Sequence, residues 1–427
     1  MFRIIAAACL TALVALPASA HNYCPLCGAA GQTLAGEINV ADFILLGKPT
    51  NPKPDKDDFT RGTTDIVIEK VVKDHPFLTG KKVIRINRLL PVDPAVDERL
   101  LVFAEVTGKP AAAAASAAVG GLVLGNVFDS PIDAYRGVQV TSDSKLAEYM
   151  KGAIAVREKD NVSKLKFFFD YLDAVELEIN TDAFQEFANA DYADVKALAG
   201  TLPKTKLFTW LKDPATPASR FGLYGLLAGN CGQKDDAAVI RQLLDDPTRR
   251  FASGLDGLLA GYILLDPKTG WEYLTSLVKN QEKQDFATQH AIVKVLRFLW
   301  DYGHDAVAKE QVVEGMTMSM ANGEFADFAI EDLRKWGRWE LTETILKTAA
   351  LETHKKEPMV KRAVLKFMIA ASEKNPKAAE FIAIARKDNP EKIKEYEEIL
   401  EQERKTALEA AVPAAATSKK KPNGGGQ

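Results

Sequence analysis

An eight-residue segment of this chain occurs twice. Residues 222–229 read GLYGLLAG and residues 254–261 read GLDGLLAG, so the second copy follows the first by 32 residues and differs at one position. A repeat of this period within a helical pattern is typical of stacked helical hairpins. Because one hairpin cannot bury its apolar face alone, the repeat predicts an array in which neighbouring hairpins pack against each other.

Each copy contains three glycines at spacings of three and four residues. They are Gly222, Gly225 and Gly229 in the first copy, and Gly254, Gly257 and Gly261 in the second. A glycine inside a helix costs about 1 kcal/mol relative to alanine, so close packing must offset the penalty. The spacing places the glycines on one helix face, where a neighbouring backbone can approach closely. We therefore expect these faces to form a helix–helix contact, and a backbone cleft for a ligand is the alternative.

The rhythm of paired helices continues along the C-terminal part of the chain. First helices are expected to begin near Thr181, Ala218, Phe251, Asp285, Glu324 and Met359. Second helices are expected at 192–202, 236–244, 269–278, 305–313, 340–350 and from 377 onward. Further helices are expected at 144–155, 162–177 and 391–410. Apolar residues recur at three and four positions in these segments. Their period and character resemble HEAT-type repeats, so residues 142–410 are expected to form an α-helical, HEAT-like solenoid.

The first 20 residues have the pattern of a secretory signal peptide. Arg3 precedes an apolar run from Ile4 to Leu16, and the small residues Ala18-Ser19-Ala20 follow. This order matches a cleavable export signal, and the run is too short to span a membrane. An uncleaved anchor is the alternative. We expect a secreted or periplasmic protein without a transmembrane segment.

The overall charge argues against one class of partner. The chain carries 55 Lys and Arg residues and 58 Asp and Glu residues, which gives a formal net charge of −3. Nucleic-acid binding calls for a basic surface, so we expect no nucleic-acid partner. Residues 411–427 end in a short basic and glycine-rich stretch and are expected to form a disordered tail.

Residues 21–141 differ in character from the helical part. Segments rich in Val, Ile, Phe and Thr predict strands at 43–47, 64–72, 82–89 and 100–106. Weaker candidates lie at 122–128 and 137–140, and 51–58 is expected to be a polar loop. Five or six short strands over about 100 residues fit a small β-barrel or sandwich. The fold class expected for the whole chain is α+β and multidomain, with a β-barrel domain before the solenoid.

One combination of segments resembles the OB-fold of tissue inhibitors of metalloproteinases and netrin-like modules. An early cysteine pair is followed by Ala41–Lys48, Thr64–Lys73 and Leu100–Ala104 in the order seen in that family. The resemblance covers about 90 residues. It implies an OB-type barrel with a ligand-binding or inhibitory role. Together with the helical array, the chain also resembles secreted bacterial proteins of unknown function.

The sharpest local motif is Cys24-Pro-Leu-Cys27. In an oxidising compartment such a pair is expected to form a structural disulfide. Two alternatives are thiol exchange, which needs a stabilised thiolate, and a metal site in which His21 joins the two cysteines. Cys231 leaves an odd number of cysteines after export, and it could pair with one of them, supply a further ligand, or remain a buried thiol.

Tryptophan and arginine residues supply the candidates for an interaction surface. Trp336, Arg338 and Trp339 lie where a first helix ends, and these residue types are favoured as binding anchors. Packing between adjacent repeats is the alternative for the tryptophans. Arg220 and Arg250 precede repeat helices and could line the rim of the array.

Motifs for catalysis are not recognised in the sequence. It contains no His-Glu-x-x-His, Gly-x-Ser-x-Gly or phosphate-loop motif, and no cofactor signature. We therefore expect a non-catalytic scaffold without a cofactor, whose helical surface binds another exported or cell-surface protein. A ligand-binding or inhibitory β-domain is one alternative, and a thiol-redox or metal-binding protein built on His21, Cys24 and Cys27 is the other.

Overall fold

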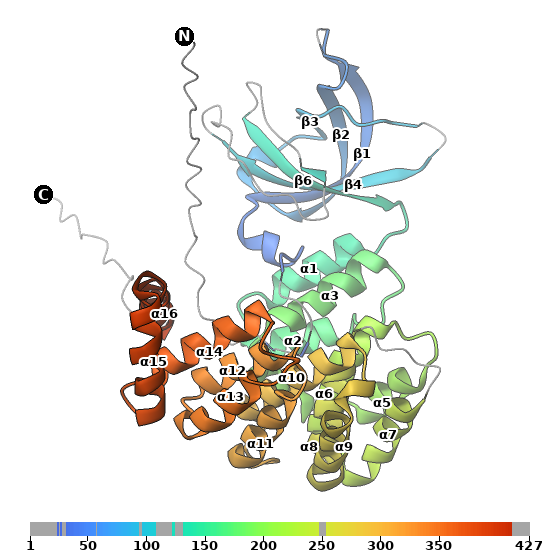
Figure 1. Cartoon of the computed structure of the whole chain (residues 1–427). Helices are drawn as coiled ribbons and strands as arrows, with labels where there is room; N and C mark the ends of the chain where they lie inside the picture. The colour runs from blue at the N-terminus through green and yellow to red at the C-terminus, as the bar shows by residue number, and fades with distance from the viewer. Residues whose placement is uncertain are drawn as a thin grey trace, which may run out of the picture. The chain divides into compact units, whose positions relative to one another are not determined.

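A computed structural model of the chain shows an antiparallel sheet followed by helices (Figure 1). It describes residues 24, 26–27, 31–56, 58–93, 96–107, 122–123, 131–246 and 253–411. The α+β layout is thereby confirmed. The described residues divide into two compact units, one formed by 24–277 with 285–308 and the other by 278–284 with 309–411. The expected domain boundary at 141/142 stays a prediction. The expected signal peptide and the tail beyond residue 411 lie outside the described residues.

The sheet contains six strands in the order β3-β2-β1-β4-β6-β5, and all neighbours are antiparallel. The strands are β1 (Phe43–Pro54), β2 (Gly62–Lys73), β3 (Val83–Ile86), β4 (Glu98–Val106), β5 (Leu122–Val123) and β6 (Ile132–Thr141). Among the described residues β3 and β5 each pair with one strand, so the sheet is open and a closed barrel is not confirmed.

The prediction of a polar loop at 51–58 is wrong for its first half. Strand β1 continues through it to Pro54. The strand accommodates the polar residues by an irregularity in its pairing with β2 between Thr50 and Lys53. Asn51 lies there at a φ of 51°, a left-handed conformation that asparagine tolerates better than most residues. Hydrophobic patterning therefore marks only the buried half of this strand.

Strands β1 and β4 are buried on both faces of the sheet. One face contributes the core residues Phe43, Leu45, Ile66, Ile84, Ile86, Leu100, Val102 and Ala104. Successive side chains point to opposite faces of a strand, yet Ile44, Leu101 and Phe103 are also fully buried. Helix α1 (Leu146–Val156) packs against β2, where Lys70 pairs with Glu148. The apolar runs of these strands thus reflect a sheet that is covered on both sides.

Most helices lie near their expected positions. In the first unit they are α1, α2 (Asn161–Phe169), α3 (Leu177–Asn189), α4 (Tyr192–Ala199), α5 (Lys204–Lys212), α6 (Phe221–Cys231), α7 (Ala237–Asp245), α8 (Leu255–Leu265) and α10 (Phe286–Tyr302). Helix α9 (Pro267–Lys279) ends at the division between the units. Alternate helices pack side by side, α2 with α4, α4 with α6, α6 with α8, and α8 with α10. Helix α5 was not expected, and α2 ends before residue 177.

The second unit contains the remaining helices. They are α11 (Lys309–Ser319), α12 (Ala326–Lys335), α13 (Thr342–Ala349), α14 (Pro358–Ala371), α15 (Pro376–Asp388) and α16 (Pro390–Ala411). Again α12 packs with α14, and α14 with α16. Lys366 of α14 is 6% exposed and lies 2.9 Å from Glu331 and 2.7 Å from Glu403, while Arg334 lies 2.8 Å from the same two carboxylates. This closed network of two cations and two anions joins α12, α14 and α16.

The repeated glycines lie where α6 and α8 touch. A Cβ atom on Gly257 would lie 2.0 Å from the carbonyl oxygen of Gly222, and one on Gly261 would lie 2.1 Å from that of Gly225. On the other helix, a Cβ atom on Gly229 would lie 2.6 Å from the Cα atom of Gly261. Real Cβ atoms do not come so close to backbone atoms. The two helices are therefore in direct backbone contact, which we call the glycine seam.

Two glycines of the repeat have additional roles. Gly254 is not inside a helix, because it forms the N-cap of α8 with a φ of 86°, a conformation that favours glycine. Gly222 also faces the loop of the cysteine pair, since a Cβ atom there would lie 3.0 Å from the carbonyl oxygen of Leu26. The start of α6 thus packs against both the start of α8 and the loop of the cysteine pair.

Candidate functional site

Residues 31–39, which follow the cysteine pair, are bound along one face of α3, and we call this segment the strap. The backbone of Gly31 exchanges two hydrogen bonds with the side-chain amide of Asn189, at 2.8 and 2.7 Å. The Leu34 and Ala35 N–H groups both donate to the carboxylate of Asp182, the second at 3.2 Å. The hydroxyl of Thr33 bonds the carboxyl group of Glu186. The three α3 residues in these contacts are Asp182, Glu186 and Asn189. They are spaced by four and three residues and therefore share one face of the helix.

The carboxyl groups of α3 are held in an environment that disfavours their charge. Asp182 is 5% exposed and also accepts a hydrogen bond from the Tyr149 hydroxyl at 2.8 Å. Burial raises the pKa of Asp182 even though these donors oppose the shift. Burial also raises the pKa of Glu186 to about 7, and the nearby charge of Asp182 adds to the effect, while Thr33 and Lys164 oppose it. Perturbed carboxyl groups of this kind are characteristic of functional sites.

The other side of the strap is bound to strand β6. Glu37 is 1% exposed. Its carboxylate accepts hydrogen bonds from Arg136 and from the Tyr135 hydroxyl, both at 2.9 Å, and a third from Gln32. The Nε atom of Arg136 is buried without a hydrogen-bond partner among the described residues. The strap therefore links α3 to the sheet through paired, largely buried polar groups.

A cleft of about 430 Å³ opens beside this junction. It is bordered by Gln32 and Leu34 of the strap, by Arg136, Gly137, Val138 and Gln139 of β6, and by Leu177, Glu178, Thr181, Asp182 and Gln185 of α3. Leu177 is 69% exposed, and Val175, just before α3, is fully exposed. The cleft thus combines amide, hydroxyl and charged groups with an apolar edge, a composition suited to binding a ligand or a partner segment.

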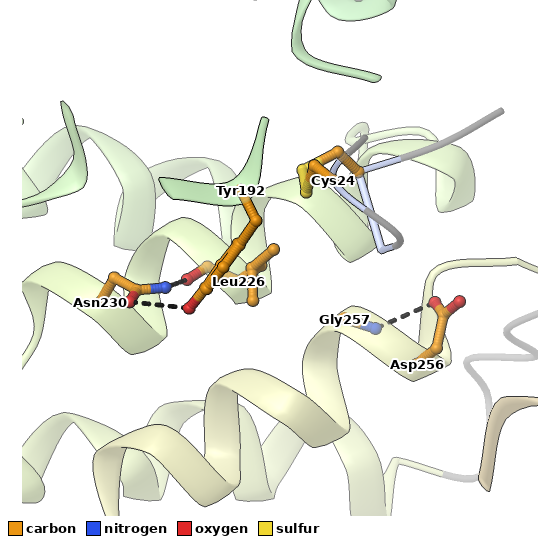
Figure 2. The surroundings of a disulfide bond; sticks show 7 residues. Cys24, Tyr192, Leu226, Asn230, Asp256 and Gly257 are labelled. Atoms are coloured by element: carbon orange, nitrogen blue, oxygen red, sulfur yellow. Dashed lines mark hydrogen bonds between the residues drawn. A yellow bond between two sulfur atoms is a disulfide. The ribbon is translucent and has the colours of Figure 1, made fainter. Parts of the chain in front are cut away.

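The cysteine pair forms a disulfide bond (Figure 2). Cys24 and Cys27 are each 1% exposed, and the N–H group of Cys24 donates to the Ala190 carbonyl at 2.7 Å. Figure 2 shows the bond close to Tyr192 and above α6. Cys231 is not part of it, and burial raises the pKa of its thiol. His21 lies outside the described residues.

We expect the disulfide to act as a modest stabilising link. The Cys24→Ser/Cys27→Ser variant should lose about 2 kcal/mol of unfolding free energy, since the closed loop is short and constrains the unfolded chain little. Urea denaturation of the oxidised protein measures the loss, and Cys231→Ser is the matched control. A double variant as stable as this control would contradict the expectation.

The tryptophan candidates are half-buried among the helices of the second unit. The ring of Trp339 contacts that of Phe367 edge to face, with centroids 5.4 Å apart. Its carbonyl accepts a hydrogen bond from Asn375 at 3.0 Å. Arg338 pairs with Glu340 at 2.7 Å, and Trp336 is half-buried at the end of α12. Trp339 thus packs against α14, so it offers part of its surface to a partner at most.

Arg220 does not lie on a rim. It is 9% exposed, donates to the side chain of Asn180 at 2.8 Å and lies over the ring of Phe184 at 4.1 Å. Burial lowers the pKa of its guanidinium group. The helical pattern correctly places Arg220 before a repeat helix. It does not indicate that the neighbouring α3 covers the side chain. Arg250, the other rim candidate, lies outside the described residues.

Comparisons with protein-family models, curated proteins and solved structures find no match for this chain. Within the part of the chain that the structure describes, none of the helices is long and apolar enough to cross a membrane. Among the same residues no three His, Cys, Asp or Glu side chains are grouped in a way that could hold a metal ion.

Proposed function

We propose that the protein is an exported, non-catalytic scaffold that binds another exported or cell-surface protein. The observation that carries the proposal is the cleft beside α3, whose lining includes the exposed Leu177, with the exposed Val175 two residues before it in the chain. Exposed apolar residues next to a polar cleft are characteristic of interaction sites. The side-by-side packing of alternate helices supports a HEAT-like solenoid, an architecture that binds partners along an extended face.

A partner-capture experiment with the full exported chain tests this proposal. The Val175→Asp/Leu177→Asp variant should retain the partner about tenfold less tightly than the wild type, a loss of about 1.4 kcal/mol. The matched control is Ile384→Asp in α15, which places a charge on a side chain that is 57% exposed. The proposal fails if no protein is retained specifically, or if the double variant and the control retain the same partner equally.

A ligand-binding β-domain is a second candidate function. Strands β3 and β6 approach each other although they are not neighbours in the sheet. This approach supports a partly open barrel of OB type, a fold that often binds ligands on its open face. The redox alternative has less support, because Cys24 and Cys27 are buried and thiol exchange requires an accessible sulfur. Thiol counting with and without reductant distinguishes a structural disulfide from free, redox-active thiols at Cys24 and Cys27.

A further inference from the structure

The side chains around the cleft present hydrogen-bond acceptors, because their donors are used by other groups. The side-chain amide of Gln32 donates to Glu37. An ionised carboxylate only accepts, so the amide oxygen of Gln32 is left as an acceptor. The hydroxyl of Thr181 donates to the side chain of Asn180 at 3.4 Å, which leaves its oxygen as an acceptor too. Both Gln32 and Thr181 line the cleft, which is therefore suited to a ligand that donates hydrogen bonds.

The charges of the cleft favour a cation. Glu178 of α3 lines the cleft with its side chain exposed, and it forms no hydrogen bond or ion pair with the rest of the described chain. Asp182 adds a second carboxyl group, which is bonded by uncharged donors. Arg136 is the cation among the described lining residues, and its pairing with the buried Glu37 balances its charge. Glu178 is thus the unpaired charge of the lining.

The other cations near the strap are bound elsewhere. Lys73 donates to the backbone carbonyl groups of Ile38 and Ala41, and the charge of Lys164 acts on Glu186. Neither lysine is among the described residues that line the cleft. A cationic ligand would therefore meet the carboxylate of Glu178 without competition from these two side chains.

We propose that the cleft binds an arginine side chain of the partner protein, with its guanidinium group at Glu178 and its aliphatic stem against Leu177. The inference rests on the proposed function, because it names the chemistry of the partner segment that the same cleft receives. Arginine fits the lining better than lysine does, since its planar head offers five donors to several acceptors. Its stem can cover apolar surface, and Leu177 is 69% exposed.

Titration of the full chain with N-acetylarginine amide, a single arginine with capped ends, tests the inference. The side-chain amide resonances of Gln32 and Gln139, which both line the cleft, report binding in NMR spectra. In the wild type they should shift with a Kd on the order of 1 mM. Glu178→Gln should bind the probe about tenfold more weakly, because a charge-assisted hydrogen bond is lost. Glu373→Gln, which changes an exposed carboxyl group outside the cleft, should bind like the wild type.

Reversing the charge gives a second test. Glu178→Lys should lose the arginine probe and bind N-acetylglutamate amide instead, with shifts of the same resonances. The inference is overturned if the arginine probe shifts neither resonance in the wild type, or if Glu178→Gln binds it equally well. It is also overturned if the wild type binds the glutamate probe as tightly as the arginine probe, or if Glu178→Lys does not bind the glutamate probe.

These outcomes are distinct from those of the partner-capture experiment. If no partner is captured but the arginine probe binds at the cleft, the proposed function fails and the chemistry of the cleft stands. If a partner is captured through the cleft but the arginine probe does not bind, the inference fails and the proposed function stands.

Discussion

Replacing Gly257 with alanine should destabilise the protein by about 3 kcal/mol or more, although alanine is the better helix former. The new methyl group would lie 2.0 Å from the carbonyl oxygen of Gly222, a rigid backbone atom that cannot rotate away. Helices α6 and α8 would have to separate, and the apolar contacts on both sides of the glycine seam would be lost. Thermal unfolding followed by circular dichroism measures the effect.

A glycine with open space around it provides the control for the Gly257 substitution. At Gly200, after the end of α4, a Cβ atom would have its nearest neighbour at 3.9 Å. Gly200→Ala should therefore unfold within about 0.5 kcal/mol of the wild type. If Gly257→Ala unfolds at the same temperature as Gly200→Ala, then the close contact between α6 and α8 is not required for stability.

The Asp182→Ala variant should lose about 3 kcal/mol of unfolding free energy. Its carboxylate accepts from the Leu34 and Ala35 N–H groups and from the Tyr149 hydroxyl. Each donor left buried without a partner costs about 1–3 kcal/mol. Relief of the buried carboxyl group offsets part of the total, which is why the expected loss is smaller than the sum. Urea denaturation, with limited proteolysis to detect release of the strap, provides the measurement.

Thr181→Ala is the control for this second substitution. Thr181 is the exposed neighbour of Asp182 on α3, and its loss should change stability by about 0.5 kcal/mol or less. The role assigned to Asp182 would be wrong if both variants unfold at the same urea concentration and their straps resist protease equally.

The α+β layout could be predicted because its signals are local. Short apolar runs rich in β-branched and aromatic residues mark β1, β2 and β4, and apolar residues at spacings of three and four mark most helices. The repeated glycines predict a close contact because their cost within a helix calls for compensation. The polar half of β1 escaped prediction since neither of its faces is apolar there. Helix α5 also could not be predicted from the repeat, because a period of paired helices has no place for a third.

The candidate site could not be predicted, for a different physical reason. Leu34 and Asp182 are 148 residues apart in the chain, and neither belongs to a recognised motif. Asp182, Gln185, Glu186 and Asn189 do form a polar stripe at helical spacing, but such a stripe ordinarily faces solvent. Only the position of the strap shows that this stripe is covered. The burial of Arg220 could not be predicted for the same reason, because it depends on contacts with α3.

The glycine seam has a mechanical consequence. Side chains usually separate packed helices, and they can change rotamer when one helix moves against the other. Between α6 and α8 the carbonyl oxygens of Gly222 and Gly225 instead touch the opposite main chain, so there is no soft layer to absorb a displacement. Helices α6 and α8 should therefore move as one rigid pair, and a displacement at one end of the pair should be transmitted to the other end with little loss.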